Sequence, residues 1–132
     1  MTLHITGLYV GLTIILTIVL GMRVGLYRGK TKVSIGDAGN QELALRVRHH
    51  ANLLETAALT LLAIGVLEIN GTSATTLHAL GIAYIIARIL HPIGLKAETI
   101  THPLRAIGAM GSTLVMLISG LMAIGQFIGH LG

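Results

Sequence analysis

The feature that most constrains this chain is its division into four long apolar segments. Short polar stretches separate them, and the predicted helices cover residues 3–26, 41–69, 74–91 and 103–128. A helix needs about 20 mostly apolar residues to cross the hydrocarbon core of a bilayer. Charged residues make up only 11% of the chain and the mean hydropathy is +0.82, whereas a soluble domain carries about 25% charged residues. The sequence therefore predicts an all-α integral membrane protein with a single domain.

The connecting stretches predict how these helices are joined. Asp37 or Asn40 is expected to cap the second helix, and Thr101 or His102 the fourth, since these residue types accept hydrogen bonds from exposed backbone N–H groups. The segment Pro92-Ile93-Gly94 is expected to end the third helix after about His91. Because short connections join antiparallel neighbours, the chain is predicted to form a four-helix up-down bundle.

Basic residues are distributed unevenly among these connections. Every Lys and Arg lies in or near the first and third connections, and the second turn and both termini have none. Basic residues stay preferentially on the cytoplasmic side, so we expect both termini to face away from the cytoplasm. Nucleic acid is not expected as a partner despite the net charge of +4, because aromatic residues are only 3% of the chain and no basic stripe is present.

Metal and thiolate chemistry are not expected from the chain's own residues. The chain has no cysteine, which excludes disulfides, thiolate metal sites and a cysteine nucleophile. His49 and His50 are adjacent, so in a helix they point about 100° apart and cannot share a metal ion as an i, i+4 pair would. We therefore predict no metal site, and any reactive thiol must come from a substrate.

Polar residues line one face of the second predicted helix. Arg48, Asn52 and Glu55 are spaced i, i+4, i+7 and therefore stand on the same face. At 1.5 Å per residue, Glu55 lies about 21 Å from the far end of this helix, in its cytoplasmic half. Polar side chains inside a membrane usually face a bundle interior or a water-filled cavity.

A second polar face with the same spacing lies on the third predicted helix. Tyr84, Arg88 and His91 form it, and Arg88 lies at a depth similar to that of Glu55. Arg105 stands in the first turn of the fourth helix, near the same membrane surface. We expect these groups to meet in one cytoplasmic layer, here called the polar layer, which contains Arg48, Asn52, Glu55, Tyr84, Arg88, His91 and Arg105.

Two interpretations of the polar layer are open. In the first, Glu55 pairs with Arg48 or Arg88 to lock the bundle, and Asn52 forms hydrogen bonds across helices. That network leaves more cations than acids, and unpaired buried charge is strongly disfavoured. In the second, a ligand with carboxylates or phosphates supplies the missing anions, because arginine binds such groups as a planar fork.

The sequence resembles the MAPEG family, the membrane-associated proteins in eicosanoid and glutathione metabolism. That family includes microsomal glutathione transferases, leukotriene and prostaglandin E synthases, and small bacterial members, which this short chain looks like. The resemblance is carried by the segment 35–40 before the second helix and by the R-x-x-x-N-x-x-E pattern of Arg48, Asn52 and Glu55. It is also carried by basic residues of the last two helices, Arg88, His91 and Arg105. Thr56 and Leu95 stand where several members have tyrosine, so the binding layer matches in part.

The resemblance implies a homotrimer that binds glutathione as co-substrate between protomers. It implies that Arg105 is the catalytic residue and holds the thiolate, since cations and helix N-termini lower a thiol pKa. The two carboxylates of glutathione suit arginines, and its ammonium group suits Glu55. The residues assigned to glutathione binding are Arg28, Arg48, Asn52, Glu55, Tyr84, Arg88 and His91.

The function implied is that of a membrane-embedded glutathione-dependent transferase or peroxidase in a bacterial inner membrane. Its thiolate would attack an apolar electrophile or a lipid hydroperoxide that arrives from the bilayer. The alternative is a non-enzymatic membrane protein of the same fold, either an accessory subunit or a protein whose arginines bind an anionic lipid.

Overall fold

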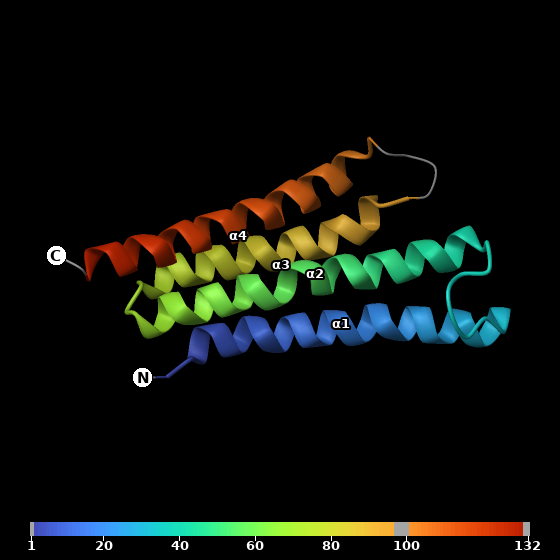
Figure 1. Ribbon diagram of the computed structural model, residues 1–132, viewed down its shortest axis with the longest axis horizontal. Helices are drawn as coiled ribbons and strands as arrows, with labels where there is room; N and C mark the ends of the chain where they lie inside the picture. The colour runs from blue at the N-terminus through green and yellow to red at the C-terminus, as the bar shows by residue number, and fades with distance from the viewer. Residues whose placement is uncertain (1, 97–100, 131–132) are drawn as a thin grey trace.

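The computed structural model describes residues 2–96 and 101–130, and its helices form an up-down bundle (Figure 1). The helices are α1 (His4–Thr31), α2 (Gln41–Ile69), α3 (Ala74–Gly94) and α4 (Pro103–Gly129). All four are long and apolar enough to cross a membrane, which confirms the predicted all-α integral membrane bundle. We call the end with the α1–α2 and α3–α4 connections the loop end. The opposite end, with the α2–α3 turn and both termini, is the turn end.

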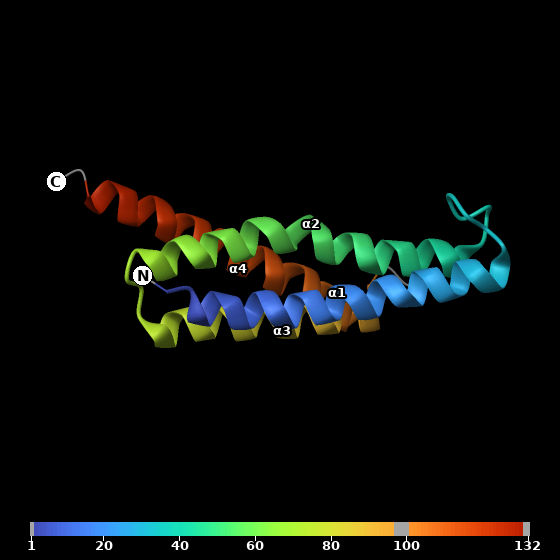
Figure 2. The same ribbon diagram turned by 90° about the horizontal axis from the view of Figure 1, so that it is seen from below.

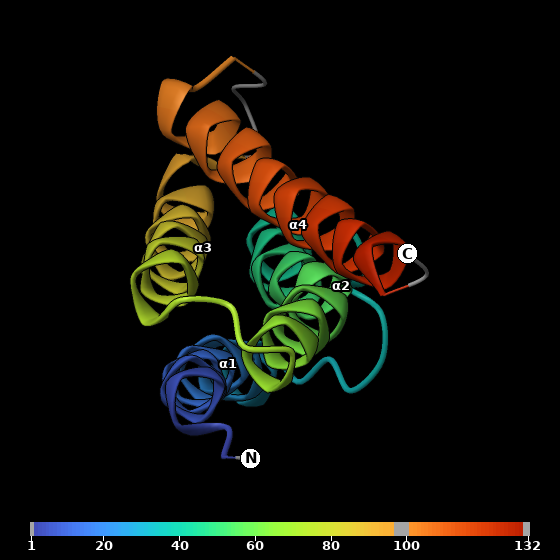
Figure 3. The same cartoon turned by 90° about the vertical axis from the view of Figure 1, so that its left-hand side faces the viewer.

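The bundle is open on two sides, because α1 and α4 lie at its opposite edges and their outer faces are not covered by another helix in the described part of the chain (Figures 2 and 3). Helices α2 and α3 lie in the middle, α1 packs against both of them on one side, and α4 packs against both on the other. Within residues 2–96 and 101–130, α1 and α4 do not contact each other. Much of the outer surface is therefore exposed and apolar, as Leu26 on α1 (73% exposed) and Met110 on α4 (72% exposed) show.

The observed helix bounds differ from the prediction at two loop-end positions. Helix α1 ends at Thr31 instead of residue 26, so Arg28 lies on the helix and not in the connection. The extra turn is supported because the Arg28 Nη1 donates to the carbonyls of Val33 (3.2 Å) and Gly36 (2.8 Å). Helix α3 also runs three residues beyond the predicted His91, through Pro92 to Gly94, the last residue of the segment expected to end it.

The last turn of α3 tolerates Pro92 for a simple reason. Proline removes one intrahelical N–H, but the next turn is closed by the Leu95 N–H, which donates to the His91 carbonyl at 2.9 Å. At the other end of the connection, α4 begins with Pro103 as predicted. Its cap is His102, whose Nδ1 accepts from the Leu104 N–H at 3.3 Å.

The cap of α2 follows the sequence prediction. Asn40 is the N-cap residue, and its Oδ1 accepts from the Leu43 N–H at 3.0 Å. Asp37, the other candidate, instead accepts from the Gly39 N–H at 2.9 Å inside the connection. One acceptor thus fixes the start of the helix, and the other fixes the turn that leads into it.

Polar contacts at the turn end connect all four helices. Glu68 on α2 accepts from the backbone N–H of Thr6 at 2.7 Å, at the start of α1. The Tyr9 hydroxyl on α1 lies 2.8 Å from Nδ1 of His78 on α3. Gln126 near the end of α4 bonds to Asn70 (3.0 Å) and Thr72 (2.9 Å) in the α2–α3 turn.

Helices α3 and α4 approach most closely at two glycines. A Cβ at Gly108 would lie 2.6 Å from the backbone nitrogen of His91 and 2.7 Å from the carbonyl oxygen of Ala87. A Cβ at Gly94 would overlap the backbone of Leu104 and Arg105. Both positions lie toward the loop end, so these two helices hold the start of α4 tightly against the end of α3.

Candidate functional site

Arg88 lies inside the protomer and not on its surface. Its side chain is buried, with 4% of the residue exposed. One terminal nitrogen, Nη1, donates to the carbonyl of Asn52 on α2 at 3.0 Å. The other, Nη2, donates to the carbonyl of Gly108 on α4 at 2.7 Å and to the hydroxyl of Ser112. A single guanidinium on α3 therefore holds both α2 and α4.

Tyr84 is buried one turn before Arg88 on the same face of α3. Its hydroxyl lies 3.2 Å from Oγ1 of Thr56, which is also within 3.5 Å of the Arg88 Nη1. This arrangement gives the hydroxyl of Thr56 a role that sequence reasoning missed. The signal was available, because Thr56 follows Asn52 by one helical turn and so lies on the same side of α2.

The three polar residues of α2 lie on its outer side. Arg48 and Glu55 are paired at 3.0 Å, with 58% and 51% of their side chains exposed. Asn52 donates to the carbonyl of Arg48 at 3.0 Å, within its own helix. Of the partners expected for Glu55, the structure selects Arg48 and not Arg88. Among the described residues the Asn52 side chain bonds only within α2, and the bond across helices is made instead by the Asn52 backbone carbonyl, which accepts from Arg88 on α3.

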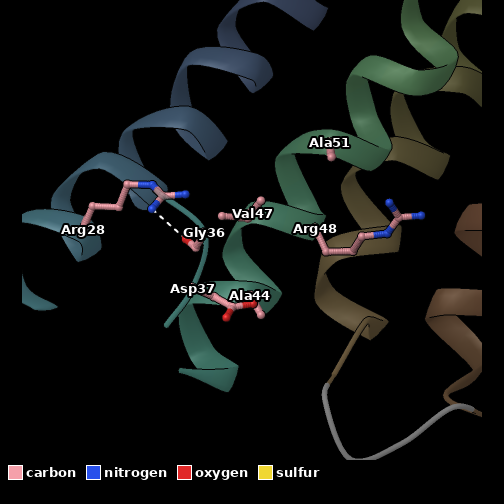
Figure 4. Close-up of a pocket in the computed structure, with 7 residues that line it drawn as sticks. All are labelled: Arg28, Gly36, Asp37, Ala44, Val47, Arg48 and Ala51. Carbon is pink, nitrogen blue, oxygen red and sulfur yellow. Dashed lines mark hydrogen bonds between the residues drawn. The ribbon is translucent and has the colours of Figure 1, made fainter. Parts of the chain in front are cut away.

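Arg28 reaches the same side of the molecule from α1. A pocket of about 320 Å³ lies between α1, the connection and α2 (Figure 4). Arg28 points across it to the Gly36 carbonyl, whereas the guanidinium of Arg48 points away from Arg28 (Figure 4). The pocket is lined by Arg28, Gly36, Asp37, Ala44, Val47, Arg48 and Ala51.

Two buried histidines lie between α2, α3 and the start of the next connection. His49 and His91 are each 6% exposed. The Nε2 of His49 lies 3.0 Å from the carbonyl oxygen of Leu95, and its Nδ1 has no hydrogen-bond partner among the described residues. His91 faces Gly108 across the close α3–α4 contact. The loop-end interior thus contains two buried imidazole rings in addition to the Arg88 guanidinium.

Arg105 stands in the first turn of α4, two residues after Pro103. It is half-buried, and its backbone lies against Gly94 at the end of α3. The first turn of a helix exposes N–H groups and carries partial positive charge. An anion near the Arg105 side chain would therefore meet two sources of positive potential.

The structure divides the predicted polar layer into an inner and an outer group. Tyr84, Arg88 and His91 are buried between helices of one protomer, whereas the outer group faces the surroundings and contains Arg48, Asn52 and Glu55. The inner group also includes Gly108 and Ser112, whose oxygens bind Arg88. The sequence shows that Gly108 and Ser112 are small residues at i, i+4 spacing on α4. It does not show that their oxygens accept hydrogen bonds from Arg88.

The geometry of the outer group suits a zwitterionic ligand. Arg48 offers a planar fork for a carboxylate, Glu55 offers a carboxylate for an ammonium group, and Asn52 offers an amide for either. Their mutual contacts satisfy them in the absence of a ligand. A ligand with both charges would exchange these contacts for its own.

Comparison with models of known protein families identifies a match. The model of the MAPEG family matches residues 6–125, which include all of α2 and α3, most of α1 and α4, and the whole polar layer. No curated protein matches the chain. Members of this family are embedded in membranes and generally bind glutathione, and they include glutathione transferases and peroxidases as well as non-enzymatic proteins. With a match over nearly its whole length, this four-helix membrane protein belongs to the MAPEG family.

Proposed function

We propose that this protein is a glutathione-dependent transferase or peroxidase of the membrane. The observation that carries the proposal is the outward polar face of α2, where about half of the Arg48 and Glu55 side chains is exposed within a membrane-spanning helix. Charged groups cost several kcal/mol when they face hydrocarbon. A protein neighbour that covers this face, with a polar ligand bound between the two, would keep these charges away from hydrocarbon.

A second and third copy of the chain are the neighbours we propose. Each protomer leaves both outer sides of the bundle open, and those sides are apolar along α1 and α4. In a homotrimer the outer face of α2 would be enclosed, and glutathione would bind between protomers. Arg28, which borders the pocket at the loop end of α2, is assigned to the same binding site.

The proposed chemistry begins with the glutathione thiol. Arg48 would hold a carboxylate, Glu55 the ammonium group, and Arg105 the sulfur as a thiolate. A free thiol has a pKa near 8.5, and adjacent cations lower it. In the transferase reaction the thiolate attacks an apolar electrophile, a C–S bond forms and the leaving group departs with the electron pair. In the peroxidase reaction two glutathione molecules are oxidised to the disulfide, while a hydroperoxide is reduced to an alcohol and water.

We propose that the loop end faces the cytoplasm. Its residues include Arg23, Arg28, Lys30 and Lys32, and the turn end carries no Lys or Arg among the described residues. Basic residues are retained on the cytoplasmic side of bacterial membranes. Glutathione would then arrive from the cytoplasm and the apolar substrate from the bilayer, and both termini would face away from the cytoplasm in a bacterial inner membrane.

The experiment that tests the proposal is glutathione binding to the purified protein in detergent, measured by calorimetry. Arg48→Ala is expected to weaken binding about 10- to 100-fold, the range that the loss of a hydrogen bond to a charged group implies. Arg23→Ala is the matched control, because Arg23 is exposed on α1 and lies outside the polar layer. Folded wild-type protein that does not bind at millimolar glutathione would refute the proposal.

The role of Arg105 is tested by ultraviolet absorbance of the bound thiolate. Arg105→Ala is expected to abolish the thiolate signal and the conjugation of an electrophile while glutathione still binds. Unchanged conjugation in that variant would remove Arg105 from the mechanism. The two variants thus separate binding, which depends on α2, from activation of the thiol at the start of α4.

One observation favours the non-enzymatic alternative. Arg28 and Arg88 each use their guanidinium to hold backbone carbonyls of the protein. If the remaining arginines serve anionic lipid or a partner subunit, native mass spectrometry would show retained phospholipid and no affinity for glutathione. Binding of glutathione that displaces no lipid would count against this alternative.

A further inference from the structure

The guanidinium of Arg88 connects two turns that carry different parts of the proposed site. On α2 it holds the carbonyl of Asn52 itself, at 3.0 Å. On α4 it holds the carbonyl of Gly108, at 2.7 Å, three residues after Arg105. The two terminal nitrogens of the planar Arg88 guanidinium therefore bind the turn of α2 that carries the Asn52 amide and the turn of α4 that follows Arg105.

Burying the Arg88 guanidinium costs free energy that an apolar side chain at this position would not cost. Among the described residues no carboxylate pairs with Arg88, and its acceptors there are neutral carbonyl and hydroxyl oxygens. Its Nε is buried without a hydrogen-bond partner in the same part of the chain. A buried charge is costly, and apolar residues of similar volume hold helices together at least as well. Stability alone does not account for a guanidinium at this position.

Other contacts show that the connection is specific to the loop end. The turn end is joined by Glu68, Tyr9 and Gln126, far along the helices from Arg88. At the loop end, α3 and α4 touch directly at Gly94 and Gly108. Helix α4 also packs directly against α2, and Arg88 adds hydrogen bonds that join the Asn52 carbonyl of α2 to the Gly108 carbonyl of α4.

We propose that Arg88 is a positioning residue, which fixes the spacing between the Asn52 turn of α2 and the Arg105 turn of α4. This inference rests on the proposed function, because the spacing matters only if one ligand spans both turns. Arg88 acts through the backbone it holds. A glutathione bound by its peptide part on α2 then presents its sulfur to Arg105 in one orientation, and a misplacement of about 1 Å in such a site costs about 100-fold in rate.

The decisive substitution is Arg88→Lys, which keeps the charge and loses the fork. A lysine ammonium is a single point and cannot bond both helices in the same geometry. We expect kcat for conjugation to fall about tenfold or more, while KM for glutathione changes less than about threefold, because the binding groups on α2 are retained. The thiolate absorbance of bound glutathione should fall in parallel. Arg23→Lys on the outside of α1 is the matched control and should change neither constant.

Two results would overturn the inference. Full kcat in Arg88→Lys would mean that only the charge matters. A parallel loss of glutathione affinity, kcat and thermal stability would mean that Arg88 serves the fold alone. Where Arg88→Lys does not fold, Ser112→Ala removes one α4 acceptor and leaves the Gly108 carbonyl, so a smaller loss of kcat at constant KM is expected, and an unchanged kcat would contradict the inference.

A distance measurement distinguishes this inference from the proposed function. The chain has no cysteine, so Leu54→Cys and Ile107→Cys, both at exposed positions, introduce unique sites for nitroxide labels, diluted with unlabelled protein. We expect the distance distribution between α2 and α4 to become longer and broader in Arg88→Lys. If wild-type protein binds no glutathione, the proposed function fails, and an unchanged distribution would still overturn the positioning role.

Discussion

Gly108→Ala should separate α4 from α3 and break the contact that Arg88 makes with α4. The added Cβ would lie 2.6 Å from the backbone nitrogen of His91 and 2.7 Å from the carbonyl oxygen of Ala87. Ordinary van der Waals contact between such atoms begins at about 3.5 Å. Both obstacles are backbone atoms inside a helix, so no side chain can rotate away. The start of α4 must therefore move outward by about 0.8–0.9 Å, the difference between these distances.

The cost of this movement can be worked out from the contacts it affects. The bond from Arg88 to the Gly108 carbonyl, now 2.7 Å long, would lengthen to about 3.5 Å, beyond the useful range of a hydrogen bond. Loss of a bond to a charged donor costs about 1.5–3 kcal/mol. Overpacking at a close helix contact costs about 1–3 kcal/mol. Together they predict that Gly108→Ala lowers the free energy of unfolding by about 2.5–6 kcal/mol.

The matched control lies on the same helix. A Cβ at Gly120 would meet no atom within 4 Å, so Gly120→Ala should stabilise α4 by about 0.5–1 kcal/mol through helix propensity. Unfolding by sodium dodecyl sulfate from mixed micelles, followed by circular dichroism, measures both variants against wild type. If Gly108→Ala is as stable as Gly120→Ala, then α3 and α4 are not in contact as described and the reasoning fails.

Three further substitutions test the contacts that fix the helices. Glu68→Gln removes the charge that accepts from the N–H of Thr6 at the start of α1. We expect the first turn of α1 to lose about 0.3–1 kcal/mol of stability, seen as faster hydrogen exchange in that turn alone. Asn40→Ala removes the cap of α2 and should lower the unfolding free energy by about 1 kcal/mol, whereas an unchanged value would show that the cap is not formed. A Cβ at Gly81 would lie 2.3 Å from the ring of Tyr9, which is buried and whose hydroxyl is held by His78, so Gly81→Ala should lower the unfolding free energy by at least about 1–3 kcal/mol through overpacking; a variant as stable as Gly120→Ala in the same denaturation assay would contradict this contact.

The helices and their order were predictable because length and apolar content decide them in a membrane. The bounds of α2 are those predicted, since Asn40 at its start is a residue with a strong local preference for capping. The end of α1 was not predictable from local pattern. Arg28 extends that helix by bonding carbonyls of Val33 and Gly36, which lie beyond it. Pro92 gave a strong signal for a helix end, but in a last turn it removes only one bond.

The composition of the polar layer was predictable, whereas its division into inner and outer groups was not. Helical spacing places Arg48, Asn52 and Glu55 on one face, and that is where they lie. Which helices cover that face depends on packing, and the open arrangement leaves it outside. The partners of Arg88 include two backbone carbonyls, and every residue has one, so a sequence contains no signal that selects them.

The contacts at the turn end have a consequence for how accurately the loop end can be aligned. Glu68, His78 and Gln126 fix the helices relative to one another at one extremity, so small changes of tilt there are amplified along the bundle like the movement of a long lever. Helix α2 has 29 residues and is therefore about 43 Å long, so a tilt of about 2° displaces its loop end by about 1.5 Å. A substitution at Gln126, at the opposite end of the bundle, would then disturb the alignment of the helices that carry the polar layer.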